Sequence, residues 1–325
     1  MAAPVTTPQD DVARAAFRPP GEDLPSGPGR LVPVPARAPR RPAAALPMFV
    51  TSSVMLIVSL LALTFVATLS IIGAVHHARD QQTAFAELRG TLANATTPVT
   101  QTDDGGKLTP LGTPLAVIDI PQINLREVMF EGTTAGVLRS GPGHRRDTPL
   151  PGQAGISVVM GRQAAYGGPF GSIGELAPGD VFSITTGQGR QSFRVIDVRR
   201  AGDPAPQPLA TGKSRVMLIT AAGAAWVPQG LLRVDADLVG EVQSAGLRPL
   251  TYAALPEPEL PMKSDPSVLI WILLLSQALL LSAVSVTWAR YRWGRWQVWL
   301  SGGPLLFAIG VALCDQAAQL LPNLL

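Results

Sequence analysis

Few residues in this chain could act as a nucleophile or as a general base. The 325-residue sequence holds one cysteine, Cys314, and three histidines, His76, His77 and His144. Cys314 lies in an apolar run, and one cysteine can build neither a disulfide framework nor a cysteine-based metal site. His76 and His77 are adjacent, so in a helix they point in different directions and favour interfacial positions over a metal pair. We therefore expect no metal ion and no cofactor.

The composition indicates a membrane protein. Apolar residues make up 46% of the chain, charged residues only 15%, and the mean hydropathy is +0.25. An ordinary soluble protein is less apolar than this. The net charge of +3 gives little electrostatic support for nucleic-acid binding, so no nucleic-acid partner is expected.

Three apolar stretches predict transmembrane helices, at 48–75, 267–288 and 296–316, and the third is uncharged as far as Cys314. The first two exceed or match the roughly 20 residues that a helix needs to cross hydrocarbon. Gly302, Gly303 and Pro304 interrupt the third stretch, although neighbouring helices can satisfy the backbone groups that such residues free. No small-residue cleavage site follows the first stretch, which favours a retained anchor over a signal peptide.

Basic residues predict how these spans are oriented. Arg37, Arg40 and Arg41 precede the first span, and the basic aromatic segment 290–295 separates the other two. Because cytoplasmic loops carry an excess of Arg and Lys, both basic segments are expected in the cytoplasm. The N-terminus then lies inside the cell and the region between the first two spans lies outside it.

The remaining segments differ in composition. Residues 1–47 are rich in proline and poor in large apolar side chains, which predicts a disordered cytoplasmic tail. Residues 76–112 read as a helical stalk followed by a polar linker, and 243–266 read as a second linker. Between them, 113–242 hold short β-branched or aromatic runs bounded by Gly and Pro. Such a pattern predicts a closed β-barrel or a sandwich, and periodicity alone leaves that choice open.

Seven segments of this β region carry a family resemblance. They are Pro114–Pro121, Glu131–Thr133, Leu138–His144, Pro151–Gly155, Val158–Phe170, Ala177–Asp180 and Arg215–Gly223. In this order they resemble the sortases, and the second and third resemble class E sortases in particular. The resemblance implies a mainly β chain with a sortase-like closed barrel of about eight strands and a substrate groove.

The same resemblance implies a catalytic cysteine, histidine and arginine, and this chain departs from all three. The cysteine position holds Ala221, the histidine position holds Arg162, and the arginine position falls on Gly230 or Leu231. A methyl group cannot attack a carbonyl, and a guanidinium stays protonated near neutral pH. We therefore expect no catalytic residue and an enzyme that has lost its chemistry.

Other residues could line the former groove or replace the lost groups. The groove candidates are Arg162, Tyr166, Phe170, Thr220 and Arg233. Thr220 is expected on the opposite strand face from position 221, and Ser157 has no base nearby in the sequence. Arg162 could bind a carboxylate of a ligand, or simply pair with Asp180 or Glu175.

Three functions remain open. The leading hypothesis is a pseudosortase, a multi-pass membrane protein whose extracytoplasmic barrel binds or scaffolds at the cell envelope. The candidate partners besides the membrane are envelope or surface proteins, or an active sortase. One alternative is an active transpeptidase or hydrolase with a relocated nucleophile. The other is a structural subunit of a membrane complex, in which the spans form the functional surface.

Overall fold

The computed structural model describes residues 45–102, 106–246, 248–293 and 295–325. Most of the predicted proline-rich tail, residues 1–44, therefore lies outside the described residues. The long helices are α1 (Ala45–Ala67), α2 (Gly73–Ala93), α4 (Leu269–Trp293) and α5 (Arg295–Ala318), and α3 (Ala135–Leu138) is a single turn. Helix α1 thus begins three residues before the expected boundary.

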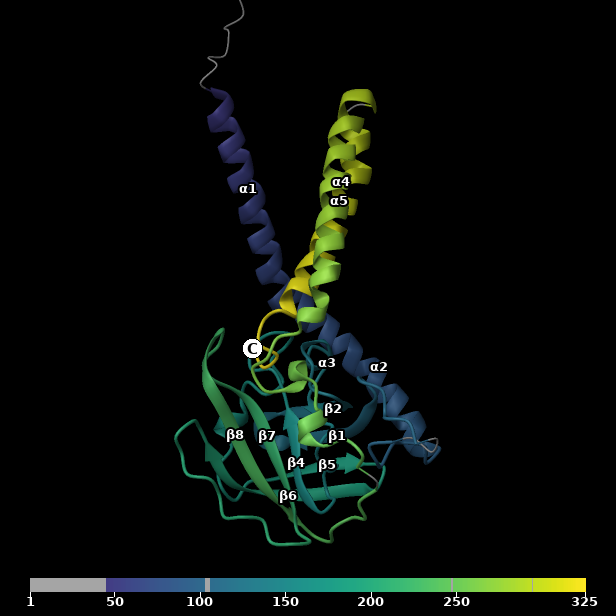
Figure 1. Cartoon of the computed structure of the whole chain (residues 1–325), viewed down its shortest axis with the longest axis vertical. Helices are drawn as coiled ribbons and strands as arrows, with labels where there is room; N and C mark the ends of the chain where they lie inside the picture. The colour runs from purple at the N-terminus through teal and green to yellow at the C-terminus, as the bar shows by residue number, and fades with distance from the viewer. Residues whose placement is uncertain (1–44, 103–105, 247, 294) are drawn as a thin grey trace, which may run out of the picture. The chain divides into compact units, whose positions relative to one another are not determined.

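Eight strands close into one barrel (Figure 1). They are β1 (Pro114–Ile120), β2 (Leu125–Glu131), β3 (Gly143–His144), β4 (Gly155–Met160), β5 (Val181–Thr186), β6 (Gly189–Arg199), β7 (Ser214–Ala224) and β8 (Val227–Val239). Their order around the barrel is β1-β2-β3-β4-β7-β8-β6-β5. The predicted sortase-like barrel is confirmed, and the sandwich is excluded.

Strands β4 and β7 are parallel neighbours, and their first residues, Gly155 and Ser214, are register partners although they lie 59 positions apart in the sequence. Side chains alternate between the two faces of a strand, so this pair has an inner and an outer face. Val159 and Leu218 point into the barrel and join its main core with Phe170 and Phe193. The outer face carries a separate apolar cluster, described below with the site.

Helices α1 and α2 form an almost continuous helix joined by a π-helical segment, Thr68–Ile72. A π-helical segment shifts the hydrogen-bond ladder by one residue, which leaves backbone groups for other partners. Here the carbonyl oxygen of Leu69 accepts a hydrogen bond from the backbone N–H of Tyr166 at 3.0 Å. The barrel is thereby joined to the helix at the irregular segment.

The segment expected to be a stalk is helical as far as Ala93 and packs against the barrel. Leu88 is 1% exposed and belongs to a cluster with Val128 and Phe130 of β2. The side chain of Gln81 accepts a hydrogen bond from the N–H of Val128 at 2.7 Å and donates one to its carbonyl at 3.0 Å. Helix α2 therefore covers one side of the barrel.

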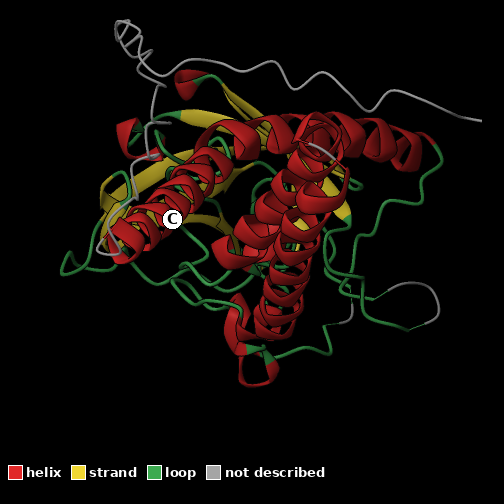
Figure 2. Ribbon diagram, turned by 90° about the horizontal axis from the view of Figure 1, so that it is seen from above, coloured by secondary structure: helices red, strands yellow, loops and turns green. Residues whose placement is uncertain are grey.

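Three helices in the described residues are long and apolar enough to cross a membrane (Figure 2). They lie within Val58–Ala93, Pro266–Ala289 and Leu300–Ala318. Pro304 lies inside α5 without ending it. The three predicted transmembrane helices thus exist as helices of sufficient length.

The segment predicted as the second linker also lies on the barrel. It contains the 3-10 turns Tyr252–Ala254 and Glu257–Glu259. Glu259 is fully buried, and its carboxylate accepts hydrogen bonds from the guanidinium of Arg146, at 3.0 and 3.1 Å from Nε. The hydroxyl of Thr133 donates to the backbone oxygen of Glu259 at 2.7 Å. These bonds fix the chain that leads into α4.

Candidate functional site

Ala221 lies near the end of β7 on the outer face of the barrel. In the ladder with β8 it pairs directly with Leu231, which selects Leu231 over Gly230 as the residue opposite it. Ile219, two residues earlier, shares its face. Arg162 follows β4 by two residues, since that strand ends at Met160. Parallel pairing of β4 with β7 therefore brings Arg162 and Ala221 to one region of the barrel.

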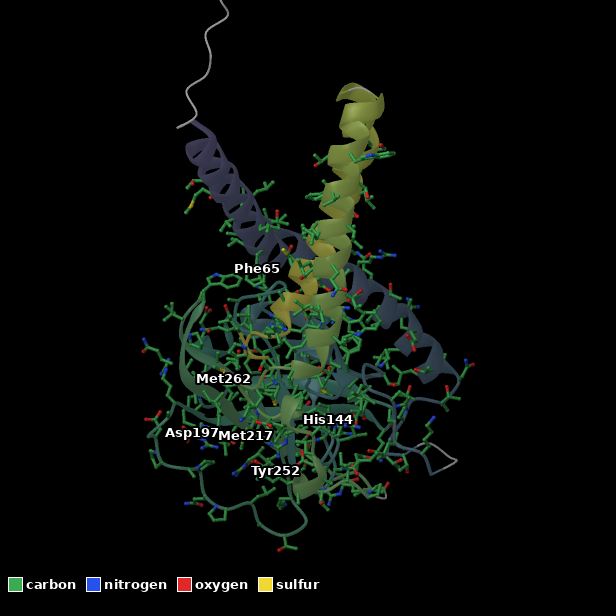
Figure 3. The ribbon with its side chains drawn as sticks, turned by 45° about the horizontal axis from the view of Figure 1, so that its top comes forward. Phe65, His144, Asp197, Met217, Tyr252 and Met262 are labelled. Atoms are coloured by element: carbon green, nitrogen blue, oxygen red, sulfur yellow. The ribbon has the colours of Figure 1, made fainter. Side chains whose placement is uncertain are left out.

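A segment from the far end of the sequence, residues 321–325, covers this region. Leu324 is 0% exposed and packs in one apolar cluster with Ala221, Ile219 and Met160, which Leu138 and Val158 complete. Met217 and Met262, both labelled in Figure 3, pack against the same cluster. Ala221 itself is only 1% exposed, so the position is closed to solvent.

The covering segment pairs with the loop after β4 through its backbone. The N–H of Gln163 donates to the carbonyl oxygen of Leu324 at 2.9 Å, and the N–H of Ala165 donates to that of Leu325 at 3.2 Å. The N–H of Leu325 also donates to the carbonyl oxygen of Pro322 at 3.1 Å, so the covering segment is a turn held by the loop after β4.

Asn323 fixes the preceding turn of the segment. Its side chain is fully buried, and Nδ2 donates to the carbonyl oxygens of Thr133 at 2.9 Å and Leu260 at 3.0 Å. Its backbone N–H donates to the carbonyl of Lys263 at 2.9 Å. The amide thus joins the covering segment to both the barrel and the chain before α4.

Arg162 is the largest fully buried side chain of the described residues. Its Nη2 donates to the carbonyl of Ala135 at 2.9 Å, Nη1 lies 3.5 Å from the carbonyl of Leu325, and the guanidinium lies 5.0 Å from the ring centre of Tyr166. Burial lowers the pKa of Arg162 to about 10, so the group is still protonated at neutral pH. It cannot exchange protons there as a histidine would.

Neither acid suggested by the sequence pairs with Arg162. The carboxylate of Asp180 accepts from the N–H of Ala177 at 2.8 Å, and no ion pair joins Arg162 to Glu175 in the described part of the chain. The charge rests instead on two carbonyls and an aromatic ring. Arg162 is therefore built into the interior and is not displayed on a rim.

Tyr166 links this region to α5. Its hydroxyl donates to one carboxylate oxygen of Asp315 at 3.1 Å, and Arg139 donates to the other at 2.6 Å. Burial raises the pKa of Tyr166 above its ordinary value, which keeps the phenol protonated as a donor. Sequence reasoning named Tyr166 but missed Asp315, because an acid near the end of an apolar helix gave no sign of its partner.

The other groove candidates divide between the two faces. Phe170 belongs to the barrel core and Thr220 faces inward, on the other side of β7 from Ala221. Arg233 pairs with Ile219 across the ladder and so shares the outer face. The guanidinium of Arg233 makes no side-chain hydrogen bond or ion pair with another residue that the structure describes.

The remaining reactive groups lie elsewhere. The hydroxyls of Ser157 and Thr220 are buried and have no hydrogen-bond partner among the described residues. Both ring nitrogens of His144 form hydrogen bonds, Nδ1 with the carboxylate of Glu131 at 3.0 Å and Nε2 with the carbonyl of Pro149 at 3.0 Å. His144 lies in register with Val159 and through it with Leu218, on the inner face. Cys314 is buried in α5.

Sequence reasoning missed the covering segment altogether. Its signal is visible in retrospect at Pro322 and Asn323, which follow the end of α5 at Ala318, and at the two leucines after them. Apolar residues that follow the end of an apolar helix must be buried against another part of the protein. Only the fold shows that this part is the surface over Ala221.

Comparison with known proteins agrees with this geometry. The family model described as the sortase domain matches residues 118–226, a range that includes both Arg162 and Ala221. Sortase D of Bacillus subtilis (strain 168) is 29% identical over 83 residues, which are 26% of this chain and 40% of that protein. The chain thus matches two fifths of this relative's length.

Solved sortases are similar to this chain at low sequence identity. A sortase D5 transpeptidase of Clostridium perfringens is 20% identical with a TM-score of 0.41, and the match covers 50% of this chain and 99% of that one. Sortase E1 of Streptomyces coelicolor, solved with a tripeptide in its active site, is 21% identical with a TM-score of 0.36 and covers 40% and 90%.

Proposed function

We propose that this chain is a catalytically inactive, sortase-like membrane protein that binds or scaffolds partners at the cell envelope. One observation carries the proposal. The outer-face cluster around Ala221 is formed by Leu138, Val158, Met160 and Ile219, with Leu324 over them. A surface of this kind contains neither a nucleophile nor a base.

The chemistry of peptide transfer explains why this composition is decisive. Transfer needs a nucleophile to attack a carbonyl, a group to protonate the leaving amine, and donors that stabilise the oxyanion. Ala221 supplies a methyl group, Leu231 supplies a branched alkyl group, and Arg162 is a buried cation whose donors already bind carbonyls. Each of the three requirements is unmet at its position.

A relocated nucleophile has little support. Ser157 is 0% exposed and Thr220 is 1% exposed, and both face the inside of the barrel. A peptide on the outer face cannot reach either hydroxyl without passing through the β4–β7 pair. His144 lies on that inner face too, bonded to Glu131.

The proposed location is the cell membrane, with the barrel outside the cytoplasm. Three helices of sufficient length support a multi-pass chain, and the basic residues before the first span and between the last two support the orientation. A barrel in that place can bind envelope or surface proteins, or an active sortase. In such an assembly this chain would be the member without catalytic activity.

The test is turnover by the purified full-length chain in detergent, with an active sortase as the positive control. We expect no cleavage or transfer of surface-protein sorting peptides above the buffer rate, since loss of one member of such a catalytic unit costs several orders of magnitude. Ser157→Ala and Thr220→Ala should leave that background unchanged. Turnover that survives purification and disappears in either variant would establish a relocated nucleophile instead.

A further inference from the structure

The hairpin that joins β7 and β8 ends in an exposed, uncharged tip. Ala224 pairs with Val227, so Ala225 and Trp226 form a two-residue turn. Trp226 is 43% exposed and Val227 is 59% exposed. No Asp, Glu, Lys or Arg occurs in the sequence from 216 to 232, so the tip lies in an uncharged stretch. Because a hairpin turn in water usually carries Asn, Asp or Gly, this tip has the composition of a surface that leaves water.

The backbone of Trp226 is strained at this turn. Its φ is 70°, in the left-handed region that glycine and asparagine adopt at low cost and that bulky residues rarely adopt. A turn selected for folding alone would carry glycine at such a position. Residues held in such conformations cluster at functional sites, which points to a role of the Trp226 indole outside the folding of the barrel.

The base of this hairpin is bonded to the loop that holds the ends of two apolar helices. The side chain of Gln163 donates to the carbonyl oxygen of Gly223 at 2.8 Å. Three residues along the same loop, the N–H of Tyr166 donates to the carbonyl oxygen of Leu69 at 3.0 Å. Tyr166 also packs in one cluster with Leu69 and with Ala318, the last residue of α5. The tip therefore begins one short loop away from these helix ends.

Apolar side chains of the first helix indicate how far lipid reaches. Ile71 is 71% exposed and Val75 is 64% exposed, and both follow Leu69 along the chain. In a helix that crosses a membrane, exposed side chains of this kind face the hydrocarbon or the interface. Lipid then extends past the contact of Leu69 with Tyr166, to the level of the loop after β4. The hairpin bonded to that loop lies at the membrane surface.

We propose that the β7–β8 tip, residues 224–227, inserts into the lipid interface beside the apolar helices, with the Trp226 indole among the headgroups. Tryptophan suits that place because its ring is apolar and its N–H can donate to a polar neighbour. A second attachment besides the helices fixes the tilt of the barrel on the membrane. The assignment depends neither on the loss of catalysis nor on the orientation of the chain, since the tip and the helix ends are joined on one side of the bilayer.

A fluorescent reporter on the tip tests this with lipid as the available partner. The full-length chain carrying Cys314→Ala and Val227→Cys is labelled with bimane and placed as one copy in each phosphatidylcholine nanodisc. We expect lipids with a nitroxide near the headgroup to lower the emission at 227 at least twofold. Thr211→Cys is the matched control, because it is exposed and precedes the opposite end of β7. The 11 residues of that strand separate the two labels by roughly 30 Å, so emission at 211 should not change.

Substitution of Trp226 separates lipid contact from folding. Glycine adopts a φ of 70° without strain, so Trp226→Gly should melt at the same or a higher temperature, while the quenching at 227 falls by at least half. Trp226→Tyr keeps an interfacial aromatic ring and should retain the quenching.

Three outcomes would overturn the proposal. Emission at 227 that the lipid nitroxides do not lower would show that the tip stays in water. A lower melting temperature for Trp226→Gly would assign the indole to the fold of the barrel. Protection of 227 from aqueous iodide only in nanodiscs that hold two copies would assign the tip to a second copy of this chain.

Discussion

At the scale of single residues, the unusual feature is a buried arginine that pairs with no Asp or Glu side chain of the described residues. Arg162 fills the position at which the resemblance expects a histidine, and it bonds to the carbonyls of Ala135 and Leu325 and stacks on Tyr166. Its Nε has no hydrogen-bond partner among the described residues. Burying a charge in this way is costly, so the gain must come from packing and from satisfying carbonyls.

Substitution of Arg162 separates volume from charge. Arg162→Ala should lower the free energy of unfolding by about 3 kcal/mol, because it opens a cavity and leaves the Ala135 carbonyl unpaired. Arg162→Met keeps most of the volume and removes the buried charge, so it should cost only about 1 kcal/mol. Denaturant or thermal unfolding of the full-length chain in detergent gives both values. Equal damage in the two variants would show that the charge itself is required.

That Arg162 and Ala221 stand at former catalytic positions stays a prediction, which rests on the register of the neighbouring motif residues. The partners of Arg162 could not be predicted from the sequence. Asp180 and Glu175 were plausible acids, but the actual acceptors are backbone carbonyls, one of them in Leu325. Backbone acceptors carry no signature in the sequence, and a partner so distant along the chain is set by the fold alone.

At the scale of elements, the segments that read as connections have become parts of the domain. The 243–266 segment is fixed by the buried pair of Glu259 with Arg146, and helix α2 lies on β2. Short strands could be predicted from alternation and turn residues, whereas closure of the barrel required the family resemblance. The packing of the polar 243–266 segment on the barrel could not be predicted, because one buried ion pair does not change the polar composition of such a segment.

The pair of Glu259 with Arg146 should stabilise the barrel far more than a neighbouring exposed pair. Hydrogen bonding to Glu259 raises the pKa of Arg146, so the cation persists and is left half-buried when its partner is removed. Glu259→Gln should therefore lower the unfolding free energy by about 3 kcal/mol. Glu257→Gln is the matched control, since its pair with Lys263 lies in solvent, and its melting temperature should not change. Similar losses in both variants would contradict this assignment.

At the scale of the whole molecule, the barrel and the last span are joined at several points. Asp315 of α5 binds Arg139 and Tyr166, and the residues after α5 cover the outer face around Ala221. The three long apolar helices could be predicted from hydropathy, and the barrel from its motifs. The contact between the barrel and residues 321–325 could not be predicted, because a hydropathy pattern does not show where residues after an apolar helix pack.

The orientation of the chain is the prediction that belongs to this scale. Basic residues at 37–41 and 290–295 are expected in the cytoplasm, with residues 113–242 outside. Protease added to intact protoplasts should remove the barrel while an N-terminal epitope tag stays protected. A lysed sample, in which both are digested, is the control. Protection of the barrel in intact protoplasts would reverse the proposed orientation.

The position of Leu324 has a consequence for biosynthesis. Val239 ends the last barrel strand, yet the apolar floor around Ala221 stays uncovered until Leu324 has been made. At roughly 5–20 residues per second, translation of the intervening hairpin takes on the order of ten seconds. During that interval the newly made barrel exposes the apolar residues around Ala221, which only the last part of its own chain covers.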